Sequence, residues 1–259
     1  MAILVGDIHG NVEKVRAFLD YKPDEIHVAL GDYLDSFFEP QFRQLEALQL
    51  LLDSSAILLW GNHDVHYLKT PPWICTGFQY GKEKPLQAII GANKDRFLAA
   101  YAVDGWLCTH AGVHIRVARP KRCGGDVVML ADKFNADMQK YLKKPETYQR
   151  INSISPSPPI FNIGQGRGGN SRCAGIFWFD YRRESGLAHV NQIFGHTEGK
   201  KTPVHDKTRV LGEYHDYVCL DTTNNKTECW LYDTGINELV CLPTQRQCEF
   251  SLLPAVGLW

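Results

Sequence analysis

The sequence has no apolar run of the roughly 18 or more residues that a membrane-spanning helix requires. It also lacks an excess of one charge, since 28 basic and 29 acidic residues give a formal net charge of -1. A balanced charge provides no overall positive field for non-specific binding to nucleic acid. The first residues enter an apolar strand pattern directly, without the basic and long apolar regions of a signal peptide. We therefore expect a soluble, cytoplasmic protein with no membrane association and no strong nucleic-acid signal.

Cys-x-x-Cys spacings are also absent, although the chain contains eight cysteines. Several cysteines lie in apolar runs, among them Cys108 and Cys219. This distribution indicates reduced core thiols rather than a disulfide framework or a zinc-binding cluster. A disulfide between Cys241 and Cys248, which flank the turn residue Pro243, is the alternative.

The 259 residues suffice for one large domain with a substantial core, and we expect a single domain over 1–259. Its first 65 residues repeat one pattern: an apolar run, a Gly followed by Asp or Asn, and a polar cluster. The runs are Ala2 to Val5, Glu25 to Leu30 and Ala56 to Trp60. The segments between them have apolar residues at helical spacing. This β-α-β-α-β order predicts an α/β protein with a largely parallel sheet.

The remaining pattern is less regular. Helices are predicted from about Leu86 to Ala100 and from Asp126 to Leu142, and the Ser-, Pro- and Gly-rich segment 153–172 is predicted to be a long functional loop. Asn224 and Asn225 suggest a hairpin turn. We expect variable cap or insert segments around 66–100 and 113–190. The later strands are predicted at 105–108, 175–179, 190–194, 217–220, 227–232 and 239–242.

Five short motifs follow apolar strand patterns in order. They are Gly6-Asp7-Ile8-His9-Gly10, Gly31-Asp32-Tyr33-Leu34-Asp35, Gly61-Asn62-His63-Asp64, Thr109-His110-Ala111-Gly112 and Gly195-His196-Thr197. Loops at the carboxyl ends of parallel strands meet at one sheet edge, so these polar residues can converge. Carboxylate oxygens and imidazoles are suitable ligands for Mn, Fe or Zn. Two such ions close together need a shared anionic ligand, and Asp32 is placed to supply it.

The five motifs resemble those of the calcineurin-like metallophosphoesterase superfamily. Gly195-His196-Thr197, with Val218-Cys219-Leu220-Asp221-Thr222 following, is most similar to the phosphoprotein phosphatase branch, including bacteriophage and bacterial serine/threonine phosphatases. The resemblance covers roughly residues 1–235 and implies a four-layer α/β/β/α sandwich. It also implies two divalent metal ions, Mn in preference to Fe or Zn. The implied ligands are Asp7 and His9 for the first metal, Asp32 as the bridge, and Asn62, His110 and His196 for the second metal.

The same resemblance implies a reaction in which a metal-bridging hydroxide attacks phosphorus in line. His63 matches the residue that donates a proton to the leaving oxygen. Asp35 matches the carboxylate that orients this imidazole. A neighbouring carboxylate raises the pKa of a histidine, which keeps the proton available near neutral pH.

One departure from the family pattern concerns the first metal, and another concerns the substrate phosphate. Many phosphodiesterases of the superfamily have a second histidine, which binds the first metal, where this chain has Glu198. The difference favours the phosphatase branch or leaves the first metal with more water. The phosphatases usually have an arginine after the Asp of the second motif, where this chain has Ser36. Arg182 is the preferred substitute for that phosphate-binding residue. Arg167 and Lys200 are weaker candidates.

We therefore predict a metal-dependent phosphatase that hydrolyses phosphate monoesters, on a phosphorylated protein or a small phosphorylated metabolite. A phosphodiesterase or dinucleoside-polyphosphate hydrolase is the alternative, because the same metals can serve either bond type. A non-catalytic metal-binding scaffold is less favoured, since the chain retains His63. His66 is close enough to the third motif to line the site, and Trp73 precedes an aromatic segment that could border the substrate or pack in the core.

Overall fold

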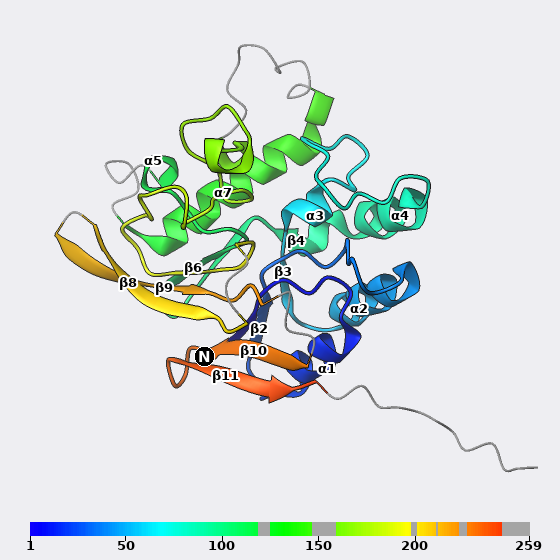
Figure 1. The fold of residues 1–259 in the computed structure, drawn as a ribbon, viewed down its shortest axis with the longest axis horizontal. Coiled ribbons are helices and arrows are strands. Elements are labelled where there is room, and N and C mark those ends of the chain that lie inside the picture. The colour runs from blue at the N-terminus through cyan, green and yellow to red at the C-terminus, as the bar shows by residue number, and fades with distance from the viewer. Residues whose placement is uncertain (119–124, 147–158, 198–200, 211, 223–226, 245–259) are drawn as a thin grey trace, which may run out of the picture.

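The computed structural model describes residues 1–118, 125–146, 159–197, 201–210, 212–222 and 227–244. Within these ranges no helix is both long and apolar enough to span a membrane. The strands form a six-stranded sheet in the order β11-β10-β1-β2-β3-β4 and a five-stranded sheet in the order β5-β6-β7-β9-β8 (Figure 1). Their bounds are β1 Ala2–Val5, β2 Ile26–Ala29, β3 Ile57–Leu59, β4 Phe97–Leu98, β5 Ala100–Val103, β6 Trp106–Thr109, β7 Gln192–Phe194, β8 Val204–Val210, β9 Glu213–Cys219, β10 Glu228–Asp233 and β11 Glu238–Pro243.

The helices lie mainly in the first half of the chain. Their bounds are α1 Val12–Asp20, α2 Gln41–Asp53, α3 Asn62–Val65, α4 Glu83–Asn93, α5 Ile115–Ala118 and α7 Val127–Lys143, with short 3-10 turns at Lys94–Arg96, Pro159–Phe161 and Gln165–Arg167. α1 begins at Asn11, whose side chain accepts a hydrogen bond from the Lys14 backbone amide at 2.9 Å. Asp126 starts α7 in the same way. Both are residues with a short polar side chain that satisfies a free amide of the first turn.

The six-stranded sheet is parallel from β1 through β4, and β10 joins β1 in the antiparallel direction. One face of this sheet packs against α1 and α2, where Val5 and Ala29 share a buried cluster with Phe18 and Leu48. The first three strands of the chain and the helices between them therefore follow the β-α-β-α-β prediction.

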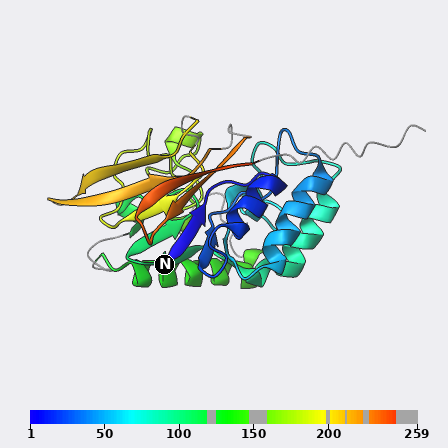
Figure 2. The same ribbon diagram turned by 90° about the horizontal axis from the view of Figure 1, so that it is seen from below.

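The two sheets face each other across a second apolar cluster. Leu4 and Val28 of the first sheet meet Cys108 and Ile193 of the second in this cluster. The outer face of the second sheet carries α7, which packs against β5 and β6. Figure 2 shows this green helix and the blue and cyan helices on different sides of the strands. The order helix, sheet, sheet, helix confirms the predicted four-layer α/β/β/α sandwich.

Two secondary-structure predictions are wrong. The helix predicted to reach Ala100 ends at Asn93, because the chain then enters a 3-10 turn and Phe97 pairs with β3 as part of β4. The run Gly175 to Phe179 is not a strand. The backbone amide of Phe179 instead donates to the Gly175 carbonyl at 3.1 Å, which closes a turn. Apolar side chains in this run are buried in a loop rather than in a sheet.

The strand pairing of the last third also differs from the prediction. Asn224 and Asn225 lie outside the described residues, but the flanking strands β9 and β10 belong to different sheets, so no hairpin joins them. The hairpins are β8–β9 and β10–β11. β8 was not predicted, because its residues are mostly exposed and give no apolar alternation. The alternative of a Cys241–Cys248 disulfide is not tested, since Cys248 also lies outside the described residues.

Candidate metal centre

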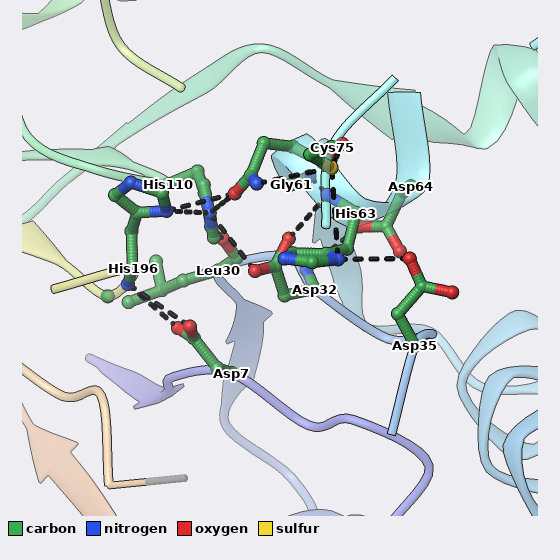
Figure 3. A network of polar contacts seen from close by, with 12 residues as sticks. Asp7, Leu30, Asp32, Asp35, Gly61, His63, Asp64, Cys75, His110 and His196 are labelled. Atoms are coloured by element: carbon green, nitrogen blue, oxygen red, sulfur yellow. Dashed lines mark hydrogen bonds and ion pairs between the residues drawn. The ribbon is translucent and has the colours of Figure 1, made fainter. Parts of the chain in front are cut away.

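The candidate metal centre lies where strands of both sheets end. Each of five predicted ligands lies within three residues of the end of a strand, and Figure 3 labels four of them close together. β1, β2 and β3 supply residues from the first sheet, and β6 and β7 supply residues from the second. These residues are Asp7, Asp32, Asn62, His110 and His196. The strand ends thus bring together side chains that are up to 189 positions apart.

One group of ligand atoms surrounds His110. Its Nε2 lies 2.8 Å from Asn62 Oδ1, 3.2 Å from His196 Nδ1 and 3.4 Å from an oxygen of Asp32. His196 Nδ1 lies 2.9 Å from the same Asn62 oxygen. Four atoms that can each bind a metal therefore converge from four segments of the chain.

A second group consists of Asp7, His9 and Asp32. His9 Nε2 lies 3.8 Å from Asp32 Oδ2, and ligand atoms of the three residues lie within 4.8 Å of one another. The same limit holds for Asp32, His110 and His196. Asp32 belongs to both groups, so its carboxylate lies where the two groups adjoin.

The protonation pattern of the histidines fits a bound metal. His9 Nδ1 lies 2.7 Å from the carbonyl oxygen of Leu34, and His110 Nδ1 lies 2.9 Å from that of Leu30. A carbonyl oxygen only accepts, so each Nδ1 donates, and in the neutral ring the Nε2 lone pair is then directed at the group. Hydrogen bonds of this kind commonly orient metal-binding histidines. With carboxylate and amide oxygens beside them, these residues suit Mn, Fe or Zn.

The backbone at the centre adopts conformations that L-residues seldom occupy. The φ angles of His9, Asp32, Asp35 and His196 are 44°, 55°, 60° and 63°. Such conformations persist where the surrounding structure holds them and they concentrate at functional sites. They turn the chain sharply after each strand. Gly61 is also required there, because a Cβ at this position would overlap the Asp32 backbone and carboxylate.

Asp64 holds the turns together, a role that the sequence analysis missed. Its carboxylate accepts hydrogen bonds from the amides of Asp32 at 2.8 Å, Tyr33 at 3.0 Å and Gly61 at 2.9 Å. The side chain is fully buried. Asp64 is the last residue of the third motif, and this position was the signal that could have identified it. It fixes the second motif against the third.

The predicted pair His63 and Asp35 is adjacent to the centre. His63 Nδ1 lies 2.9 Å from Asp35 Oδ2, and the His63 amide donates to Asp32 Oδ1 at 2.9 Å. Burial lowers the pKa of His63, but Asp32 and Asp35 outweigh it and place the pKa well above its ordinary value. Burial raises the pKa of Asp35, but its contacts with His63 and His66 hold it below the usual range. The pair therefore favours a charged imidazolium facing a carboxylate.

His66 shares the same carboxylate from the other side. Its Nε2 lies 2.6 Å from Asp35 Oδ2, and its Nδ1 lies 2.9 Å from Cys75 Sγ. Tyr67 donates to the other Asp35 oxygen at 2.5 Å. His66 had been a secondary candidate because it is close to the third motif. Cys75 gave no signal, since the segment between it and the motif carries no recognisable pattern.

The family model for calcineurin-like phosphoesterases matches residues 2–198. The chain belongs to this family. Members are metallophosphoesterases, which together with the groups around Asp32 indicates a hydrolase with a metal-binding site. A comparison with curated protein sequences found no match.

Solved structures similar to this calcineurin-like phosphoesterase share 10% sequence identity with it. A metallophosphoesterase from Sphaerobacter thermophilus has a TM-score of 0.48, with 94% of this chain and 88% of that chain covered. A protein serine/threonine phosphatase from Saccharomyces cerevisiae, described as similar to human phosphatase PP5, has a TM-score of 0.47 over 94% and 79%. A hypothetical protein from Pyrococcus horikoshii has a TM-score of 0.43 over 95% and 88%. Likenesses at this level do not identify a substrate.

Arginines of this calcineurin-like phosphoesterase gather at the edge of the centre around Asp180, which is buried. Its Oδ2 lies 3.2 Å from Arg167 Nε and 3.7 Å from Arg183 Nε, and its Oδ1 lies 3.8 Å from Arg182 Nε. All three arginines line a cavity of about 590 Å³ that also contains the candidate metal ligands Asp7, His9, Asp32, Asn62 and His196. Arg182 thus lies at the cavity, as does the weaker candidate Arg167. Lys200 and Glu198 lie outside the described residues.

The exposed aromatic side chains at the rim of the cavity come from the segment after the second motif, and not from the segment after Trp73 that the sequence analysis considered. Phe37 and Phe38, directly after Ser36, are 75% and 60% exposed and line the cavity. Trp73 packs against Phe161 and other core aromatics. Of the two roles considered for it, substrate contact and core packing, the structure therefore supports core packing.

Proposed function

We propose that the protein is a metal-dependent phosphatase that hydrolyses phosphate monoesters. The observation that carries the proposal is the shared position of Asp32. It belongs to both metal-binding groups, and one of its oxygens also accepts the backbone amide of His63. A carboxylate between two metals and beside a proton donor matches what in-line hydrolysis of a phosphate ester needs.

Asp7, His9 and Asp32 would hold one divalent ion, and Asp32, Asn62, His110 and His196 would hold another. Mn is the preferred ion, with Fe or Zn as alternatives. Bound there, the ions would supply Lewis acidity and produce an oxygen nucleophile from water near neutral pH. Asp32 belongs to both ligand sets, so the two ions would lie next to each other and share the negative charge of its carboxylate.

His63 would provide the proton for the leaving oxygen. Asp35 holds its Nδ1 at 2.9 Å, which leaves Nε2 available to the cavity that His63 lines. The carboxylate keeps the ring oriented and protonated, and general acids of this kind contribute when the leaving group is poor. Asp35 therefore acts through His63 as a positioning residue.

The arginines favour a monoester over a diester. A phosphate monoester carries up to two negative charges and a diester carries one, so cationic groups beside the metals favour the monoester. Arg182 and Arg167 are placed at the cavity wall, and guanidinium groups bind phosphate oxygens through paired hydrogen bonds. They would replace the arginine that this chain lacks at Ser36.

The substrate would be a phosphorylated protein or a small phosphorylated metabolite. Phe37 and Phe38 line the cavity and are exposed, which gives its rim an apolar surface. Side chains of this type can contact an apolar part of the substrate while the phosphate reaches Asp32.

Hydrolysis of p-nitrophenyl phosphate and bis-p-nitrophenyl phosphate tests the proposal. Metal-stripped protein is resupplied separately with Mn²⁺, Fe²⁺ or Zn²⁺, and Asp32→Asn is compared with Asp206→Asn, whose aspartate is exposed on β8. The proposal requires metal-restored activity that is higher on the monoester and is lost in Asp32→Asn alone. Preferential cleavage of the diester would support the phosphodiesterase alternative instead.

A further inference from the structure

A third set of metal-binding atoms lies beside the candidate centre. His63, His66 and Cys75 each offer an atom, and these atoms lie within 4.8 Å of one another. Cys75 Sγ is 2.9 Å from His66 Nδ1 and 3.9 Å from His63 Nδ1. The two imidazoles meet edge to face, with ring centroids 5.5 Å apart. Two nitrogens and one sulfur therefore lie close enough together to bind one ion.

The local fold explains why these residues converge. His63 lies in α3, and His66 follows directly at its end, so the two histidines are three positions apart on one helical face. Cys75 comes from the following loop, where its amide lies 3.5 Å from His66 Nδ1 and its sulfur lies 3.6 Å from the Asn62 carbonyl oxygen. The cysteine is thus held against the helix by backbone as well as side-chain contacts.

The donor set differs in kind from that of the candidate centre. The groups around Asp32 contain oxygen and imidazole ligands, which suit Mn as well as Zn. A thiolate with two imidazoles instead favours zinc, which takes sulfur and nitrogen ligands in tetrahedral sites, and it is a poor set for Mn. An ion that is bound here would be distinguished from the catalytic ions by its preference for sulfur.

The surroundings of the three residues also suit a small cation. His66 is fully buried, and its Nε2 has no hydrogen bond of good geometry although Asp35 Oδ2 lies 2.6 Å away. The Asp35 carboxylate therefore adds negative charge beside the cluster. Cys75 is half-buried and lines the cavity of the candidate centre, which gives an ion a path from solvent.

We propose that His63, His66 and Cys75 form a zinc-binding site, separate from the candidate catalytic metals, whose occupation inhibits the enzyme. The inhibitory consequence rests on the proposed function of His63. A zinc ion bound through His63 Nδ1 would replace the contact of that nitrogen with Asp35, which orients the ring. The proton donor would then be withdrawn from its working position. Zinc would have this effect and manganese would not, because zinc binds a thiolate strongly and manganese binds it weakly.

Cobalt provides a readout of binding that does not depend on activity. A cysteine thiolate bound to Co²⁺ gives a near-ultraviolet sulfur-to-metal charge-transfer band, and the ligand groups around Asp32 contain no sulfur. Protein whose candidate catalytic positions are loaded with Mn²⁺ is titrated with Co²⁺. We expect the band in the wild type and in Cys173→Ser, a half-buried cysteine elsewhere in the fold, and its loss in Cys75→Ser. Absence of the band in the wild type would overturn the proposed site.

Thiol alkylation tests the same site without a substitution. Iodoacetamide labelling is mapped by mass spectrometry with and without Zn²⁺, using the half-buried Cys173 and the exposed Cys241 as internal references. Zinc is expected to protect Cys75 and to leave both references unchanged. Equal labelling of Cys75 in both samples would contradict zinc binding even if the Cys75→Ser variant did not fold.

Zinc inhibition then connects the site to activity. Each protein is assayed with Mn²⁺ and increasing Zn²⁺, relative to its own rate without zinc. Removal of the sulfur ligand should raise the zinc concentration for half inhibition by about tenfold or more in Cys75→Ser. Equal inhibition of both proteins would refute the regulatory role. A cobalt band without hydrolysis of any ester would support the metal site and refute the proposed function. Hydrolysis without the band would support the proposed function and refute the metal site.

Discussion

The carboxylate of Asp64 accepts a hydrogen bond at 2.8 Å from the backbone amide of Asp32, the residue shared by both candidate metal groups. The same carboxylate also binds the amides of Tyr33 and Gly61. It is therefore the point at which two ligand-bearing turns are joined. The position of Asp32 depends on a residue that need not touch metal or substrate.

Substitution Asp64→Asn is expected to destabilise the fold by about 1–3 kcal/mol, because the amide side chain has one acceptor oxygen and leaves a buried backbone N–H unpaired. Urea unfolding, followed by far-ultraviolet circular dichroism, measures the change. Asp20→Asn, at an exposed position in α1, is the matched control and should stay within about 0.5 kcal/mol of the wild type. An equal effect of the two substitutions would show that Asp64 does not hold the turns.

The role of His63 predicts a dependence on the leaving group. His63→Ala should slow the hydrolysis of an alkyl phosphate by roughly 10²- to 10⁴-fold, because an alkoxide needs a proton to leave. The loss for p-nitrophenyl phosphate should be much smaller, since p-nitrophenolate leaves without protonation. kcat for both esters is compared with that of His205→Ala, a variant on β8 outside the cavity. Equal losses for both esters in His63→Ala would exclude His63 as the proton donor.

The arginines at Asp180 predict a selective loss of monoester activity. Removal of a charge-assisted hydrogen bond to phosphate in Arg182→Ala or Arg167→Ala should cost about 1.5–3 kcal/mol, or roughly ten- to a hundredfold in kcat/KM. The effect should be smaller for a diester, which carries less charge. Arg209→Ala, on the exposed strand β8, is the control. Unchanged kcat/KM in both cavity variants would place the phosphate elsewhere.

The candidate ligands could be predicted from the sequence because each is part of a local strand-turn pattern. Asp7 and His110 lie one or two residues after short buried strands, and the ends of parallel strands meet at one edge of the sheet whatever the sequence between them. The contact of His66 with Cys75 could not be predicted in this way. It depends on the path of an irregular loop, for which neither periodicity nor spacing gives a signal.

The errors in the predicted fold also arise where the sequence has no distinctive periodicity. Gly175 to Phe179 is apolar and buried, but a short apolar run does not distinguish a strand from a packed loop. β8 pairs with β9 at seven positions although most of its side chains are exposed. Backbone hydrogen bonds support this pairing, and they do not depend on apolar side chains that could be recognised in the sequence. The core elements were predictable because β1 is a short apolar run that is buried throughout, and because α1 and α2 each bury one face, which sets their apolar spacing.

Metal binding by Asp32→Asn tests the central claim most directly. Metal-stripped wild type, Asp32→Asn and Asp206→Asn are equilibrated with Mn²⁺, and the bound metal per chain is measured by elemental analysis. If Asp32 is the ligand shared by two adjoining ions, the wild type and Asp206→Asn will bind two Mn²⁺, and Asp32→Asn will lose at least one of them. Two bound ions in Asp32→Asn with unchanged affinity, or no more than one in the wild type at saturation, would contradict the shared site.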